Sequence, residues 1–420
     1  MNRFRLHAGA IGLAALLAMT ATACSGKGTD GGDTTGADGV KHGPGVTDKT
    51  IGVGMITDLT GPYAALAKGI TQGGQLYFEQ VNQAGGICGR QVESLVRDMS
   101  YDVQKSVAAY TELEPKVAAF GHFIGSATVG AVKDRISKDG PLTMVLAWSP
   151  QMLGAEQLQM TGTTYAIDVI NGVDYMVEKH GLKSGDKIGH IYLEGDYGDD
   201  SLAGSTYAAQ QHGMTVVEQK VKATDADMTS QIAAMKSAGV KVIVLSVSPK
   251  QTASAVGVAA AQGLNVPFIG SNSSYAPQLL ATPVGPALLK NLVVMQASSP
   301  LSADLPAMKK LAADYKAKYP NDGLDNGVMA GYTTAAITGD ALKLACEKKD
   351  LSRDGIIAAH RSQSAWDGGF GSKLDFTQVN QPPSRDTHIL QPDKDSLGGL
   401  KTIREPSASE NAKKYEIKVG

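Results

Sequence analysis

The sequence predicts an α/β protein built from two lobes, each a doubly wound parallel sheet with helices on both faces. Three observations predict this fold class. Short apolar, β-type runs alternate with helix-length segments from Ile51 onward, and the alternation occurs in two successive series. About 375 residues follow the first 45, which is more than one compact core usually holds. Alternating strands and helices imply parallel sheets covered on both faces, and two series imply two lobes.

The first series begins at Ile51. Its strand-like runs are IGVGMI (51–56), QVESLV (91–96), KVAAFGH (116–122) and LTMVLA (142–147). A helix is predicted over 64–85, because apolar side chains recur there mostly every three to four residues, at Leu66, Ile70, Tyr77 and Val81. The glycine pair that starts at Gly85 ends it.

The second series follows the same pattern. Its strand-like runs are KIGHIYL (187–193), MTVVEQKV (214–221), KVIVLSV (241–247), VPFIG (266–270) and NLVVMQ (291–296). A helix over 230–239 ends at Gly239. Two further helices are predicted over 303–319 and 327–345, and residues 383–420 are predicted to be polar loop with short strands.

The N-terminal segment predicts export. Arg3 and Arg5 precede a short apolar run and small residues, the pattern of a signal peptide over 1–23. Cys24 directly follows Ala21-Thr22-Ala23, which resembles a bacterial lipobox, so Cys24 is the predicted lipidation site; simple cleavage near Ala23 with release of the protein is the alternative. The Gly/Ser/Thr/Asp-rich residues up to 45 predict a flexible tether. The expected location is extracytoplasmic, with the protein anchored to the cell membrane by an N-terminal lipid.

Composition excludes several classes of function. The chain has 39 basic and 41 acidic residues, so its net charge of −2 provides no electrostatic attraction to nucleic acid. No apolar run beyond the signal approaches the roughly 20 residues of a membrane-spanning helix. No His/Cys cluster indicates a metal site. The GxSxG, P-loop and HExxH motifs are absent, and the loop TDLTGP (57–62) after the first strand lacks the GxGxxG spacing of a dinucleotide site, so we expect neither an enzyme nor a cofactor.

Two cysteines remain if Cys24 carries lipid. Cys88 and Cys346 are an even number in an oxidising compartment, which favours a disulfide between them. Two isolated buried thiols are the alternative, because the sequence does not show whether their Cα atoms come within reach.

The carboxyl ends of the predicted strands are where a ligand is expected, because open parallel sheets bind ligands there. The loops at these ends include 57–63, 123–128, 147–150, 194–198 and 246–249. Ser126 and Thr128 offer hydroxyl groups for a ligand, although capping a helix is the commonest use of such residues. Trp148 and Tyr197 offer aromatic walls, with packing at the lobe boundary and a simple turn role as the respective alternatives.

These loops in this order resemble the branched-chain amino acid binding family, the type I periplasmic solute-binding proteins of ATP-binding-cassette importers. The stretches that carry the resemblance are IGVGMITDLTGPYA (51–64), VNQAGGICG (81–89), VRDMSYD (96–102), FGHFIGSAT (120–128), LEGDYG (193–198) and DMTSQIAAMKSAGVKVIVL (227–245). The resemblance implies two lobes joined by a three-crossover hinge, with crossovers near 165, 297 and 378. Lobe 1 would then comprise 46–165 plus 297–378, and lobe 2 would comprise 166–296 plus 379–420.

The resemblance also implies a ligand site between the lobes. The Gly125-Ser126-Ala127-Thr128 loop and the Ala147-Trp148-Ser149 segment would hold a carboxylate or equivalent polar head in lobe 1. Tyr63 would lie at the cleft edge, and Tyr197 would reach across from lobe 2. The family places an acidic residue of the second lobe on the ammonium group of an amino acid, whereas the loop after LSV here is Ser248-Pro249-Lys250. Asp196, Asp225 or another cleft residue remain as candidates for that role.

The implied function is capture of a small polar ligand, such as an amino acid, an amide, urea or a small acid, by closure of the two lobes. The protein would act as a monomer and deliver the ligand to the permease subunits of the importer. A ligand-sensing module for a membrane signalling partner would have the same fold and is the alternative.

Overall fold

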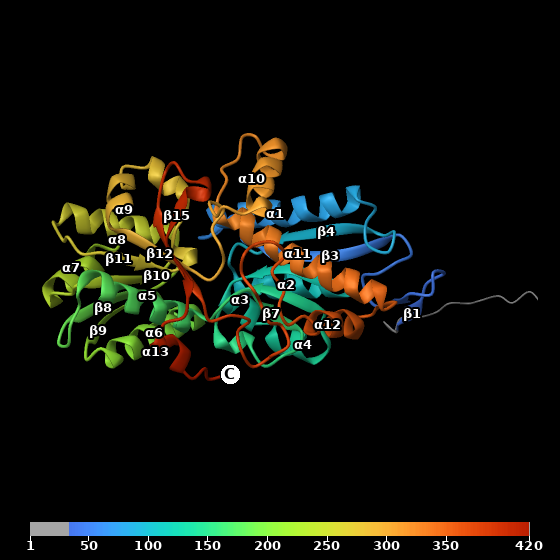
Figure 1. Cartoon of the computed structure of the whole chain (residues 1–420), viewed down its shortest axis with the longest axis horizontal. Helices are drawn as coiled ribbons and strands as arrows, with labels where there is room; N and C mark the ends of the chain where they lie inside the picture. The colour runs from blue at the N-terminus through green and yellow to red at the C-terminus, as the bar shows by residue number, and fades with distance from the viewer. Residues whose placement is uncertain (1–32, 420) are drawn as a thin grey trace, which may run out of the picture. The chain divides into compact units, whose positions relative to one another are not determined.

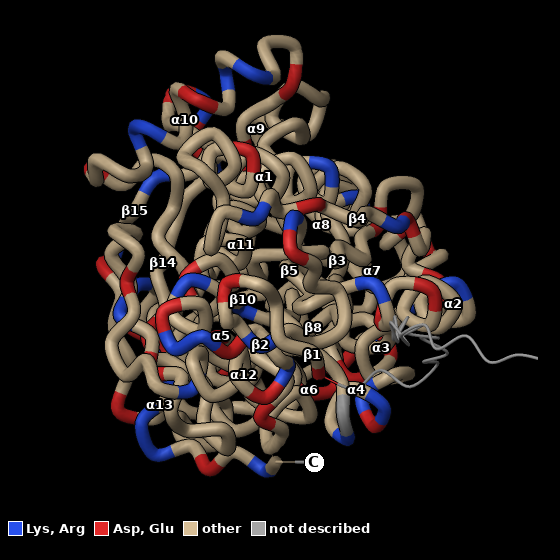
Figure 2. The backbone as a smooth tube through the Cα atoms, turned by 90° about the vertical axis from the view of Figure 1, so that its right-hand side faces the viewer, with Lys and Arg blue, Asp and Glu red and all other residues tan. Residues whose placement is uncertain are grey.

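The computed structural model describes residues 33–419 and contains two large sheets (Figure 1). The predicted signal peptide, Cys24 and the first part of the tether lie outside the described residues. Among residues 33–419, no helix combines the length and apolar character needed to cross a membrane. Basic and acidic residues are interspersed along the chain (Figure 2), in keeping with its net charge of −2.

The first lobe is built on a five-stranded, fully parallel sheet with the order β4-β3-β5-β6-β7. Its strands are β3 (Thr50–Thr57), β4 (Gln91–Asp98), β5 (Ala119–Ile124), β6 (Leu142–Leu146) and β7 (Leu158–Met160). Its helices are α1 (Ala64–Gln83), α2 (Val103–Leu113), α3 (Ser126–Gly130), α4 (Lys133–Asp139), α10 (Pro306–Lys318), α11 (Asn326–Glu347) and α12 (Arg353–Arg361). The inner strand β3 is buried from Ile51 to Thr57 because helices cover both faces of the sheet.

The second lobe is built on a seven-stranded sheet with the order β15-β14-β12-β11-β10-β8-β9. The parallel strands are β8 (Lys187–Leu193), β9 (Thr215–Val221), β10 (Val242–Ser246), β11 (Phe268–Gly270) and β12 (Leu292–Gln296), and β14 (Thr387–Pro392) and β15 (Leu400–Ser407) are antiparallel. The helices of this lobe are α5 (Tyr165–His180), α6 (Asp196–Gln211), α7 (Thr229–Ala238), α8 (Pro249–Ala261), α9 (Gly285–Asn291) and α13 (Glu410–Lys414). The predicted fold class is confirmed: two mostly parallel α/β lobes.

Helices α1 and α11, which both line the candidate site, lie close together. A Cβ atom at Gly331 of α11 would lie 1.8 Å from the carbonyl oxygen of Ile70 in α1. A Cβ at Gly73 would lie 2.1 Å from the carbonyl oxygen of Val328. Glycine at these positions is therefore what lets the two backbones approach.

The structure contains a third, small sheet, two strands of which lie within the segment up to residue 45 that the sequence predicted to be a flexible tether. Strands β1 (Thr34–Thr35) and β2 (Lys41–His42) pair with each other, and β2 pairs with β13 (Asp350–Leu351). The buried Arg90 guanidinium lies 2.8 Å from Asp38 and 2.7 Å from His42 Nε2. Residues 34–42 are therefore packed onto lobe 1 instead of forming a tether.

Cys88 and Cys346 form a disulfide, with their Cα atoms 6.1 Å apart. The bond connects the turn between α1 and β4 to the C-terminal turn of α11. It therefore links two parts of lobe 1 that are 258 residues apart in the sequence.

Candidate functional site

A cavity lies between the two lobes, at the carboxyl ends of their strands. Every strand of the first sheet contributes a residue from the loop that follows it: Tyr63 after β3, Tyr101 after β4, Gly125 after β5, Trp148 after β6 and Thr161 after β7. The second lobe contributes Tyr197 after β8, Asn272 and Ser273 after β11, and Gln296 at the end of β12, and the lining residues Ala297 to Ser299 follow at the predicted crossover near residue 297. Both lobes thus supply walls of one cavity, as expected at the strand ends of parallel sheets.

Four of the residues predicted from sequence line this cavity: Tyr63, Gly125, Trp148 and Tyr197. Gly125 adopts a φ of +94° as the residue before α3, and a Cβ there would meet the ring of Tyr101 at 2.6 Å. A side chain at position 125 would therefore be both strained and crowded.

The other five predicted residues lie beside the cavity and do not line it: Ser126, Ala127, Thr128, Ala147 and Ser149. The Thr128 hydroxyl donates back to the carbonyl groups of Ile124 and Gly125. The Ser149 hydroxyl accepts from the Gln151 N–H at 3.3 Å and so caps a short helix, Pro150–Met152. Both hydroxyls are therefore used by the local backbone. Ser126 is buried, Ala127 is exposed and Ala147 is fully buried.

Aromatic rings from both lobes meet at the cavity. The ring centroids of Tyr63 and Tyr101 are 4.8 Å apart, those of Tyr165 and Tyr197 are 4.6 Å apart, and those of Trp148 and Tyr165 are 5.9 Å apart. Burial raises the pKa of Tyr197 to about 12 and that of Tyr63 well above its ordinary value. The phenols therefore stay neutral at physiological pH and can act as hydrogen-bond donors.

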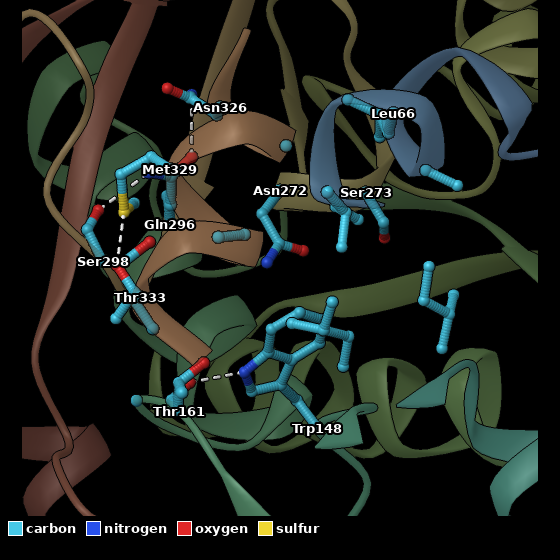
Figure 3. Close-up of a pocket in the computed structure, with 18 of the residues that line it drawn as sticks. Leu66, Trp148, Thr161, Asn272, Ser273, Gln296, Ser298, Asn326, Met329 and Thr333 are labelled. Atoms are coloured by element: carbon cyan, nitrogen blue, oxygen red, sulfur yellow. Dashed lines mark hydrogen bonds between the residues drawn. The ribbon is translucent and has the colours of Figure 1, made fainter. Parts of the chain in front are cut away.

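The side chains of Tyr63 and Asn272 are among the polar groups of the cavity wall that have no hydrogen bond of ordinary geometry within the described chain. The buried hydroxyl of Tyr63 has no hydrogen bond of ordinary geometry among the described residues and lies near the Tyr101 hydroxyl. The carboxamide of Asn272 makes none among residues 33–419, and it points into the cavity opposite Trp148 (Figure 3). By contrast, Tyr197 hydrogen-bonds to Ser271, and Ser273 donates to the Tyr197 hydroxyl at 3.1 Å. The two unpartnered groups are thus available to a ligand.

Asn272 and Ser273 were not among the residues predicted from sequence. They begin a short 3-10 helix, Asn272–Ser274, directly after β11. Ser274 fixes this turn, because its hydroxyl donates to the Ser271 carbonyl at 2.7 Å. The loop Ser248-Pro249-Lys250, where the family resemblance places an acidic residue, instead starts α8 with a capping box between Ser248 and Gln251.

No charged side chain from the described residues lines the cavity. Asp196 accepts from Gln151 at 3.2 Å, and Asp225 accepts from the backbone of Lys222; neither lines the wall. Asp58 accepts the N–H groups of Gly61 and Tyr63 and shapes the first loop. The two acids named as partners for an ammonium group are therefore not placed to meet one in this cavity.

The remaining wall of the cavity is mainly apolar and belongs to lobe 1. It is formed by Leu66, Ala67 and Ile70 of α1, Met329 and Ala330 of α11, and Trp366, Phe370 and Leu374 of the segment after α12. Both tryptophans of the chain, Trp148 and Trp366, thus line the same cavity. The described residues contain no His/Cys/Asp/Glu group suited to a metal ion.

A family model described as periplasmic binding protein matches residues 50–396. Among curated relatives, the Leu/Ile/Val-binding protein homolog 3 of Brucella melitensis is 28% identical over 200 residues, covering 46% of this chain and 53% of that protein. A leucine-, isoleucine-, valine-, threonine- and alanine-binding protein of Pseudomonas aeruginosa is 24% identical, covering 46% of this chain and 52% of that protein. The matched region thus spans about half the length of these two relatives.

Among solved structures, a fatty acid ABC transporter substrate-binding protein from Thermomonospora curvata is 52% identical. The match covers 92% of this chain and 99% of that one, with a TM-score of 0.91. A branched-chain amino acid ABC transporter protein from Thermus thermophilus with bound valine is 19% identical, covers 88% of this chain and 99% of that one, and has a TM-score of 0.77. At that identity the second match shows the fold alone.

Proposed function

The chain belongs to the periplasmic binding protein family, and from that premise we propose that it captures a small molecule with one uncharged polar head and an aliphatic tail. It would do so outside the cytoplasm and deliver the ligand to the permease of an ATP-binding-cassette importer. Of the ligands expected from sequence, this choice keeps amides and small acids that carry an aliphatic tail. Attachment to the membrane through lipidated Cys24 is part of the same proposal.

One observation carries the choice of ligand: the cavity between the lobes is aromatic and aliphatic and has no charged lining residue among those described. Burying an ammonium or carboxylate group without a partner costs several kcal/mol. Burying each methylene group of a tail contributes about 0.8 kcal/mol. The balance favours an aliphatic amide or a protonated aliphatic acid over a zwitterionic amino acid. The name of the 52% identical relative, a fatty acid transporter protein, agrees with an aliphatic ligand.

The proposed mechanism is closure of the lobes on the ligand. Tyr63 and Trp148 from lobe 1 face Tyr197 and Asn272 from lobe 2 across the cavity. A ligand that contacts all four gains free energy only when the lobes are together, so binding shifts the population toward the closed form. The permease would recognise that closed form.

Titration of the intrinsic tryptophan fluorescence tests this function, since both tryptophans line the cavity. The purified protein would be titrated with octanamide, octanoic acid, leucine and urea, and binding heats would be measured by calorimetry. We expect octanamide, and octanoic acid at low pH, to change the emission and bind, and leucine and urea to do neither. Tight binding of leucine with no response to octanamide would refute the proposed ligand class.

A further inference from the structure

The aliphatic residues of the cavity wall belong to lobe 1, which also contributes polar groups such as the Tyr63 hydroxyl, whereas lobe 2 contributes mainly polar residues. Asn272 and Ser273 from lobe 2 lie side by side and face Trp148 (Figure 3). The side chains of Ile70, Met329 and Phe370 come from three separate segments of lobe 1. An aliphatic tail can therefore be buried against aliphatic side chains only on the lobe 1 side of this cavity.

Resting on the proposed function, we propose that the ligand head binds Asn272 of lobe 2 and the Tyr63 hydroxyl. Its tail would enter lobe 1 between α1, α11 and residues 366–374, and that last segment would set the chain length accepted. The unpartnered Asn272 carboxamide and Tyr63 hydroxyl, together with the apolar wall of lobe 1, carry this orientation.

Several polar groups of the cavity wall are already hydrogen-bonded to one another and are therefore less available to a ligand head. Gln296 donates to the Ser298 carbonyl at 2.8 Å, and Asn326 donates to Gln296 at 3.0 Å. The Thr333 hydroxyl contacts the Met329 sulfur at 3.1 Å. These polar groups near the hinge are thus already engaged with one another. Asn272 offers both an N–H donor and a carbonyl acceptor, which is the complement of a primary amide or a protonated carboxyl group.

The tail position follows from the depth and rigidity of the lobe 1 wall. Along α11 the cavity extends from Asn326 to Thr333, roughly 10 Å at the rise of an α-helix. The segment 366–374 is held by two backbone hydrogen bonds between Trp366 and Leu374, of 2.9 and 2.7 Å. Trp366 also donates its Nε1–H to Asp340 at 3.0 Å. A wall fixed in this way can limit the length of the tail.

The test compares two cavity variants with two matched surface controls. Asn272→Leu removes the head contact, and Asn265→Leu is its control on an exposed asparagine. Ala330→Leu fills space beside the tail, and Ala317→Leu is its control on an exposed helical alanine in α10. Calorimetry would measure the affinities of all variants for hexanamide, octanamide and decanamide.

We expect Asn272→Leu to weaken all three amides by about tenfold without changing their order, because one hydrogen-bonded group is lost. Ala330→Leu should weaken decanamide more than hexanamide. An unchanged affinity in Asn272→Leu, or an equal loss for all chain lengths in Ala330→Leu, would overturn the orientation. If the wild type binds amides and both cavity variants behave like their controls, only this inference fails. If the wild type binds none of the amides, the proposed function fails and this inference with it.

Single-tryptophan proteins provide a second measurement that does not depend on the folding of those variants. Trp366→Phe leaves Trp148 as the reporter near the head, and Trp148→Phe leaves Trp366 as the reporter near the tail. Hexanamide should already produce the full change in Trp148 emission, and the change in Trp366 emission should grow from hexanamide to decanamide. The reverse pattern would overturn the orientation.

Discussion

Removing the disulfide should cost a large part of the stability of the protein. Cys88 and Cys346 are separated by 258 residues, and in the chain-entropy model a loop of that length contributes about 5.5 kcal/mol at 25 °C. Whole domains are typically stable by only about 5 to 15 kcal/mol. With an unfolding entropy near 2.1 cal/mol/K per residue, the loss corresponds to a fall of about 7 °C in melting temperature if the chain unfolds as one unit.

Differential scanning calorimetry of the single and double serine variants would measure this loss. Because either single substitution already breaks the bond, Cys88→Ser, Cys346→Ser and the double variant should all melt at about the same temperature. The wild type in a reducing agent should melt there too. Amide affinity should not change at a temperature where all forms are folded, since neither cysteine lines the cavity.

Two outcomes would refute the reasoning about the cross-link. The first is a wild type whose melting temperature does not respond to reduction. The second is a pair of single variants whose losses are small and add up in the double variant, because additive losses indicate packing and not a shared covalent bond.

Three further changes have defined outcomes. Tyr63→Phe removes a buried hydroxyl without a partner, so thermal melts should show no loss of stability without ligand while titration shows a several-fold weaker amide affinity; a destabilised ligand-free protein would contradict this. Burial raises the pKa of Asp168 to about 7 in the folded protein. The folded state therefore favours the protonated carboxyl group, whose contribution to stability is complete below about pH 4 and falls as the pH rises toward 7. The free energy of unfolding of Asp168→Asn, measured with urea relative to that of the wild type, should therefore be about 2 to 3 kcal/mol higher at pH 8 than at pH 5. A difference between variant and wild type that is the same at both pH values would contradict this. Gln151→Ala removes the 3.2 Å contact with Asp196 between the lobes and should weaken amide binding less than tenfold in calorimetry, a larger loss being inconsistent with an exposed contact.

The fold was predictable because hydrophobic periodicity is strong in long elements. Helix 64–85 was predicted from its apolar spacing, and α1 spans Ala64–Gln83. The small sheet was not predictable, because its two-residue strands have no periodicity and residues 34–42 are polar and glycine-containing. What orders them is buried Arg90, which comes from a segment about 50 residues further along.

The site was only partly predictable, for a physical reason that differs between the lobes. In lobe 1, Tyr63, Gly125 and Trp148 come soon after recognisable strands, so their position at a sheet edge followed from the sequence. In lobe 2, β11 has only three residues, and the Asn272-Ser273 pair after it carried no sign of facing a ligand. Trp366 lies after a helix, and only tertiary packing brings it to the cavity. For Trp366, the one signal in the sequence that could have drawn attention to it was that the chain has only two tryptophans.

Under the proposed function, a cavity without charged lining residues would select ligands by shape and hydrogen bonding and not by charge pairing. Excluding a charged head costs the protein nothing, because desolvation of that head already opposes binding by several kcal/mol. Among uncharged heads, the proposed Asn272 contact would distinguish a hydrogen-bonding group from an apolar one by about tenfold. Each extra methylene group would add about 0.8 kcal/mol only as long as it is buried in the cavity. A preferred chain length therefore requires a fixed wall, and the segment held by the Trp366–Leu374 backbone pair is the part of the lining positioned to provide it.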